Sequence, residues 1–228
     1  MAFTGFQAIA GYYTNKYIIK YNDLSFSIII GILLPDMDVV FALFCSLFIN
    51  FENSLILFTN KITHSLFLIL LIYLWGLIIS EIKRNNLYTR ITKGIIIGIT
   101  IHILFDSLFS NQTIFILWPI DIKFNILSNF KPSNLFIQLT QLFDFILFRC
   151  YGWFLNRQII LQPSSNAVYN KLINKWMTIE LYFFIIMGLL LLNQFKYFLL
   201  IWMILFSPSI IIAIILTYLI RNQLSFKK

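Results

Sequence analysis

The chain has 228 residues, of which 60% are hydrophobic, 18% are aromatic and only 11% are charged. Soluble domains are roughly one half apolar and one quarter charged, so this composition excludes a water-soluble globule, and its large apolar content also excludes a disordered chain. The formal net charge is +8, but the basic residues fall between apolar segments, which favours a role in membrane topology over nucleic-acid binding. We therefore expect a polytopic integral membrane protein.

Six apolar segments approach the roughly 20 residues that a helix needs to cross a bilayer. We expect transmembrane helices at Leu24–Ile49, Ile62–Ile82, Ile91–Phe109, Leu135–Leu155, Trp176–Leu192 and Tyr197–Ile220. The predicted fold class is all-α, with a broken first span. Residues 1–134 are expected to form one membrane core, and residues 135–228 a further set of membrane helices without an assigned role.

The break in the first span is expected at Pro35, which cannot continue the preceding helix. A proline also pushes the residue before it, here Leu34, toward extended geometry. A new helix can begin at Pro35 with Asp36 in its first turn, where the helix dipole favours a carboxylate. If the segment were unwound, Asp36 and Asp38 would project to the same side. The alternative is a short helix that does not span the membrane, followed by a loop and another helix.

The fourth span is the most polar of the six. It contains Gln138, Gln141, Asp144 and Arg149, so it is expected to be buried partly in protein or to lie at the membrane interface. Asp144 and Arg149 are five residues apart and are candidates for an internal ion pair. The stretch that follows, Asn156–Lys175, contains Gln, Pro, Ser and Asn residues, which predicts a cytoplasmic loop.

The distribution of Lys and Arg predicts the orientation in the membrane. If the N-terminus lies inside, 13 of the 17 basic residues fall on the inner side. The other four are Lys61, Lys123, Lys131 and Lys196. Cytoplasmic segments of membrane proteins carry an excess of Lys and Arg, so both termini are predicted to be cytoplasmic.

Ionisable residues inside the apolar segments are the main indication of function, because each costs about 2.5–3.5 kcal/mol or more at the centre of a bilayer. Asp36 and Asp38 lie in the first span, and His64 lies at the start of the second. His102 and Asp106 in the third span are four residues apart, which places them on one face of a helix. Under the predicted topology, all of these side chains can meet near one depth.

Two imidazoles and three carboxylates suit Zn, Mn or Fe better than Mg or Ca, which prefer oxygen ligands only. The candidate metal ligands are Asp36, Asp38, His64, His102 and Asp106. These residues also have a structural interpretation, since a lone interfacial His is usually hydrated and Asp106 could merely orient His102. The predicted cofactor is a divalent transition metal, Zn or Mn.

Four elements occur in a distinctive order along the first half of the chain. They are LLPDMD at Leu33–Asp38, THS at Thr63–Ser65, HILFD at His102–Asp106 and LWP at Leu117–Pro119. Their order and rough spacing resemble the LexA-regulated, membrane-bound metal-dependent hydrolase family, over roughly residues 4–125. The resemblance implies a multi-helix protein of a bacterial inner membrane, and hydrolysis at a metal bound by the His and Asp residues.

The chain departs from this family's pattern at two positions. The family usually has a His four residues before a Gly near its N-terminus, where this chain has Gln7 and Gly11. It also has a His-Arg pair ahead of the Thr-His element, where this chain has Thr59 and Asn60. Two expected nitrogen ligands are thus replaced by weaker oxygen donors, which predicts at most one tightly bound metal ion.

Two functions remain open. In the first, the protein is a hydrolase whose metal activates water and polarises an ester or phosphoester, and Asp36 or Asp38, whichever does not bind the metal, is the catalytic general base. A substrate that enters such a site from the side would be a membrane lipid or a lipid-linked phosphate. In the second, the protein is not catalytic, and its buried acids form a structural polar network or an ion path.

Overall fold

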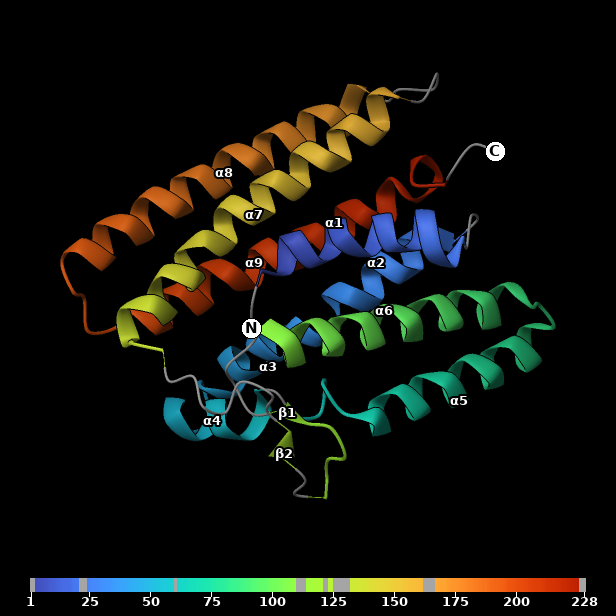
Figure 1. Cartoon of the computed structure of the whole chain (residues 1–228), viewed down its shortest axis with the longest axis horizontal. Helices are drawn as coiled ribbons and strands as arrows, with labels where there is room; N and C mark the ends of the chain where they lie inside the picture. The colour runs from blue at the N-terminus through green and yellow to red at the C-terminus, as the bar shows by residue number, and fades with distance from the viewer. Residues whose placement is uncertain are drawn as a thin grey trace.

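The structure is a computed structural model, and it describes residues 3–20, 24–59, 61–109, 114–120, 123–124, 132–161 and 167–225. These residues are helical almost throughout (Figure 1), which confirms the predicted all-α class. The strands among them, β1 (Ile114–Phe115) and β2 (Lys123–Phe124), are two residues long and pair antiparallel. Within this described part of the chain, five helical segments are long and apolar enough to cross a membrane: Ser25–Cys45, Leu66–Lys83, Leu87–Leu108, Ala167–Leu192 and Phe198–Leu219.

The first span is broken at the predicted place. It consists of α2 (Ser25–Leu33), a 3-10 turn (Pro35–Met37) and α3 (Asp38–Cys45), and the short helix α4 (Phe51–Phe58) follows. Leu34 keeps helical dihedral angles (φ −66°, ψ −40°), and its N–H donates to the carbonyl oxygen of Ile30 at 2.9 Å. The expectation of extended geometry at Leu34 is therefore wrong, because the chain tightens into a 3-10 turn instead of unwinding.

The N-terminal half of the chain surrounds this broken span. Helix α1 (Thr4–Thr14) continues as a π-helical turn (Asn15–Ile19) and packs against α2 and α7. Helices α5 (Leu66–Lys83) and α6 (Leu87–Phe109) form an antiparallel hairpin, and α2 packs along α6. Only 11% of the α5 span is buried, so most of this helix presents apolar side chains outward.

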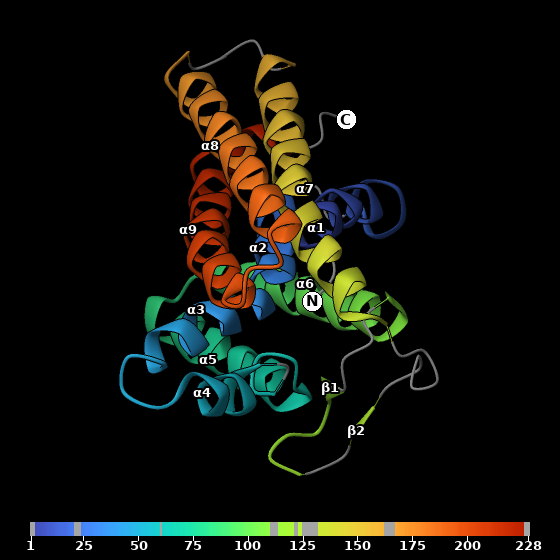
Figure 2. The same ribbon diagram turned by 90° about the vertical axis from the view of Figure 1, so that its left-hand side faces the viewer.

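The C-terminal half is a bundle of three long helices, α7 (Asn134–Ile160), α8 (Ala167–Leu192) and α9 (Phe198–Leu219), which lie side by side in both ribbon views (Figure 2). Large aromatic side chains fill its core, namely Phe145, Phe148, Tyr151, Trp176 and Phe206. Both α7 and α8 extend into the predicted loop Asn156–Lys175, whose residues 162–166 lie outside the described part. Helix α7 is long enough to cross a membrane, but its polar residues make it less apolar than the five spans.

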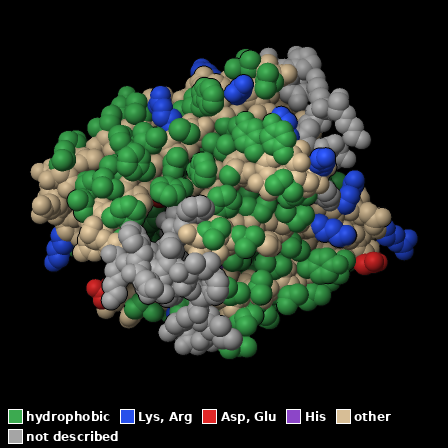
Figure 3. Space-filling model, in the orientation of Figure 1, with side chains coloured by type: hydrophobic (Ala, Val, Ile, Leu, Met, Phe, Trp, Pro, Cys, Tyr) green, Lys and Arg blue, Asp and Glu red, His purple; other side chains and the backbone are tan. Residues whose placement is uncertain are grey.

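Apolar side chains also cover much of the outer surface, which suits contact with lipid (Figure 3). In contrast, Lys and Arg residues gather toward one end of the molecule. The end of α7, the start of α8, the turn between α5 and α6 and the end of α9 all lie at this end (Figure 1). We call it the basic end, and the charge rule predicts that it faces the cytoplasm.

Reporter fusions are expected to place the Lys83–Lys93 segment, which contains the turn between α5 and α6, in the cytoplasm together with the C-terminus. The reason is the concentration of Lys and Arg at the basic end, because translocating these charges is unfavourable. The segment Asn111–Lys131, only partly within the described residues, should be reported outside. A Lys83–Lys93 segment found outside would reverse the predicted orientation.

Candidate metal centre

Five ionisable side chains from three parts of the chain are buried together in the N-terminal half. Asp36 lies in the 3-10 turn after α2, and Asp38 is the first residue of α3. His64 lies in the turn just before α5, and His102 and Asp106 lie one helical turn apart in α6. Each of the five is at most 1% exposed. Such burial is expensive for a polar group without partners, so their contacts decide what the cluster can do.

The centre of the cluster is formed by facing nitrogen and oxygen atoms. The Nε2 atoms of His64 and His102 are 3.2 Å apart. Oδ2 of Asp106 lies 3.2 Å from Nε2 of His64 and 3.5 Å from Nε2 of His102. Oδ1 of Asp36 lies 3.8 Å from Nε2 of His102. The two imidazole nitrogens therefore lie at the centre, with Asp106 close to both of them and Asp36 close to that of His102.

Asp38 lies on another side of the cluster. Its Oδ2 is 3.8 Å from Nδ1 of His64, whereas the other contacts of His64 within the cluster involve Nε2. The Thr63 hydroxyl is also within hydrogen-bond distance of this Nδ1, at 3.0 Å. Asp38 and Thr63 are thus placed to fix the ring orientation and tautomer of His64, a role that partners of metal-binding histidines commonly have.

Helix α1 begins at the cluster and supplies two polar contacts to it. The Thr4 hydroxyl donates to Oδ2 of Asp36, and the Gln7 amide donates to Oδ1 of Asp106 at 3.1 Å. Both residues are buried: Thr4 is 1% exposed and Gln7 is 2% exposed. Gln7, the position that aligns with a family histidine, therefore lies in contact with the cluster. Thr4 was not among the predicted site residues, because a lone Thr in the sequence carries no distinctive signal.

The second aligned position, Thr59, has different surroundings. Its hydroxyl donates to the carbonyl oxygen of Leu55 at 2.6 Å. Its side chain lines a small cavity of about 170 Å³ between α3, α4, α7 and α9. No contact described in the structure joins Thr59 to the His–Asp cluster. Asn60 lies outside the described residues.

The polar residues of α7 do not form the ion pair considered from the sequence. The Arg149 guanidinium donates to the carbonyl oxygen of Met177 in α8 at 2.9 Å. The Asp144 carboxylate instead accepts a hydrogen bond from the backbone N–H of Phe3, at the start of α1. Asp144 is only 2% exposed, so this buried acid anchors the start of α1 beside the cluster.

Close contact between α2 and α6 brings the two halves of the cluster together. A Cβ atom at Gly98 would lie 2.1 Å from the carbonyl oxygen of Ile28, and one at Gly31 would lie 2.2 Å from that of Ile95. Only glycine permits such an approach. The spacing Ser27-x-x-x-Gly31 and Gly94-x-x-x-Gly98 is a known sequence signal for close helix packing in membranes, and it could have predicted this contact.

The residues of the cluster fit a divalent transition metal. Among the described residues, Oδ1 of Asp36 and Nδ1 of His102 have no hydrogen-bond partner. Ligand atoms of Asp36, His64 and His102 all lie within 4.8 Å of one another. Imidazole nitrogen together with carboxylate oxygen is a typical ligand set for Zn, Mn or Fe. A cation would also offset the negative charge of the carboxylates that are buried around the two imidazoles.

Fold and site together define an integral membrane protein whose helices enclose a buried His–Asp cluster. The family model described as YdjM inner membrane protein matches residues 1–221, so the chain belongs to this family. The match is consistent with the resemblance seen in the sequence, but it extends well beyond residue 125 and includes α7, α8 and α9. No curated protein and no solved structure is significantly similar to the chain.

Proposed function

We propose that the protein is a membrane-embedded, metal-dependent hydrolase. The single observation that carries the proposal is the convergence of His64, His102 and Asp106, with Asp36 beside them. The contacts between their imidazole nitrogens and carboxylate oxygens are 3.2–3.8 Å long. These four residues would hold the ion. A bound divalent metal supplies Lewis acidity and lowers the pKa of water toward neutrality.

The remaining residues of the cluster have distinct proposed roles. Asp38 and Thr63 orient His64 through Nδ1, while Thr4 and Gln7 orient the carboxylates of Asp36 and Asp106. Oδ1 of Asp36 has no hydrogen-bond partner among the described residues, which suits an atom that binds the ion. Because helices that span the membrane enclose the cluster, the proposed substrate class is a lipid or a lipid-linked phosphate that enters laterally.

The proposal is tested by the metal content of the purified protein. We expect about one transition-metal ion per chain, because the cluster offers one compact set of donor atoms. The variants Asp106→Asn and His102→Gln should retain less than about a tenth of this metal, since each removes a good ligand from the set. Mass spectrometry of the metals in detergent-purified protein measures both quantities.

A matched control is Glu180→Gln, which neutralises another fully buried acid in α8, away from the cluster. It should keep the metal content of the wild-type protein. A wild-type protein without a stoichiometric transition metal would instead support the alternative, in which the cluster is a structural polar network. Two tightly bound ions per chain would contradict the single-ion site.

A further inference from the structure

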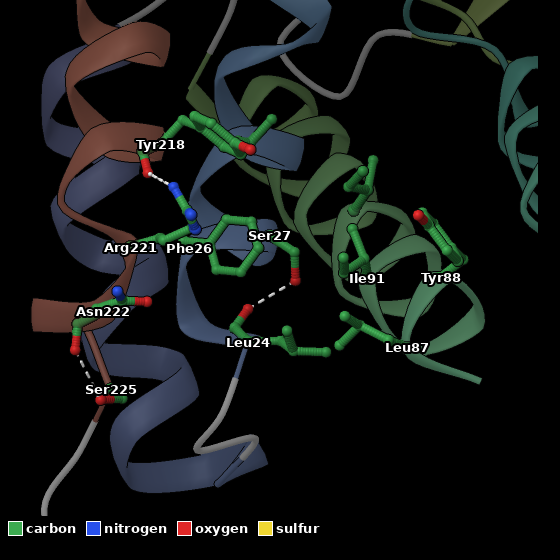
Figure 4. Close-up of a pocket in the computed structure, with 12 residues that line it drawn as sticks. Leu24, Phe26, Ser27, Leu87, Tyr88, Ile91, Tyr218, Arg221, Asn222 and Ser225 are labelled. Carbon is green, nitrogen blue, oxygen red and sulfur yellow. Dashed lines mark hydrogen bonds between the residues drawn. The ribbon is translucent and has the colours of Figure 1, made fainter. Parts of the chain in front are cut away.

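A second cavity, of about 800 Å³, lies at the basic end of the molecule (Figure 4). Its walls are the first turns of α2 and α6, the end of α9 and the 3-10 turn (Arg221–Gln223) that follows α9. Asp36, His102 and Asp106 lie farther along the broken first span and α6, and none of them lines the cavity. The cavity is thus distinct from that centre.

The lining of the cavity divides into an apolar and a polar part. Phe26, Ile30, Ile91 and Ile95 contribute apolar side chains from within the two spans. Polar side chains lie where the spans end, namely Ser27, Tyr88, Arg221, Asn222 and Ser225. Among the described residues of the lining there is no carboxylate. This division matches a ligand with a polar anionic head and an apolar tail.

Arg221 is held in a defined position beside the cavity. Its guanidinium donates to the carbonyl oxygen of Tyr218 at 3.1 Å and lies over the Tyr218 ring, 4.5 Å from the centroid. The Tyr218 ring in turn makes an edge contact with Phe26, 6.4 Å between centroids. An arginine carries five N–H donors, so this single bond leaves donors that can reach a phosphate.

We propose that this cavity binds an anionic phospholipid of the surrounding membrane, with its phosphate at Arg221 and the upper part of an acyl chain between α2 and α6. Basic pockets between transmembrane helices on the cytoplasmic side recognise anionic lipid headgroups. The basic end supplies this setting, and the cavity lies where membrane spans end, at the depth of lipid headgroups. Its volume is within the range of ligand sites, roughly 300–1,000 Å³.

The test is native mass spectrometry of the full chain in detergent, with added phosphatidylglycerol or phosphatidylcholine. The wild-type protein is expected to retain at least about five times more phosphatidylglycerol than phosphatidylcholine. A preference of this size is expected from one basic residue near an anionic headgroup. Arg221→Gln should abolish this preference. The matched control Arg157→Gln removes a charge from the end of α7, where the guanidinium lies over Trp153, and should leave the preference unchanged.

Two further measurements keep the result decisive. Ile91→Trp, which fills the cavity, should lower retention of both lipids, while glycerol phosphate without acyl chains should not compete. Equal retention of the two lipids by the wild-type protein would overturn the proposal even if the Arg221 variant failed to fold. Equal effects of Arg221→Gln and Arg157→Gln, or full competition by glycerol phosphate, would also overturn it.

Discussion

Replacing Gly98 with alanine is expected to destabilise the protein and to release its metal. The added Cβ would lie 2.1 Å from the carbonyl oxygen of Ile28 and 2.8 Å from Cα of Gly31. Both are backbone atoms, so no side-chain rotation can relieve the overlap and α2 must move away from α6. Overpacking of this kind typically costs about 1–3 kcal/mol. The melting temperature of the detergent-purified variant should fall accordingly.

The loss of metal follows from where Gly98 lies. It is one helical turn before His102 in α6, and its neighbour Gly31 lies in α2 shortly before Asp36. Any separation of the two helices therefore separates Oδ1 of Asp36 from Nε2 of His102, now 3.8 Å apart. Metal ligands must approach the ion to about 2.0–2.2 Å, so a small displacement is enough to weaken binding.

The chain offers a matched control for this substitution. Gly188 lies in α8, and a Cβ built there meets no atom within 4 Å. Gly188→Ala should keep the metal and be slightly stabilising, because alanine exceeds glycine in helix propensity by about 1 kcal/mol. If the two alanine variants had the same melting temperature and metal content, tight packing of α2 on α6 would not be what positions the centre.

Much of the fold could be predicted from the sequence because it depends on local composition. Apolar runs near 20 residues identified the spans that became α5, α6 and α9, and Pro35 marked the break in the first span. Helix α1 was not predicted, since Thr4–Thr14 is too short and too mixed to be read as a membrane span. Its position depends on distant parts of the chain, because α1 packs against α2 and α7, and Asp144 of α7 contacts the backbone of Phe3.

The candidate site could be predicted as a set of residues but not as an arrangement. Charged groups inside apolar spans are costly, and this physical argument identified the five residues that the structure brings together. Which atoms face one another depends on helix packing. The facing Nε2 atoms and the placement of Asp38 behind His64 depend on how the turn before α5 lies against α6 and α3, and neither spacing nor composition encodes such contacts directly.

The replacement Gln7→His is expected to raise the affinity of the protein for Zn by about tenfold or more, the scale on which a neighbour of a metal ligand affects binding. Gln7 is buried and donates to Oδ1 of Asp106 at 3.1 Å. An imidazole at this position would lie beside the cluster and offer a nitrogen that suits the metal better than an amide. A competitive titration against a chromophoric chelator measures the change.

Thr59→His provides the comparison, because the two positions were equivalent in the sequence argument but differ in the structure. The Thr59 hydroxyl bonds to the carbonyl oxygen of Leu55, and the side chain faces a separate small cavity. We therefore expect Thr59→His alone to leave the affinity unchanged, and the double variant to match Gln7→His. A gain from Thr59→His, or none from Gln7→His in a protein of unchanged melting temperature, would show that the metal does not bind beside Asp106.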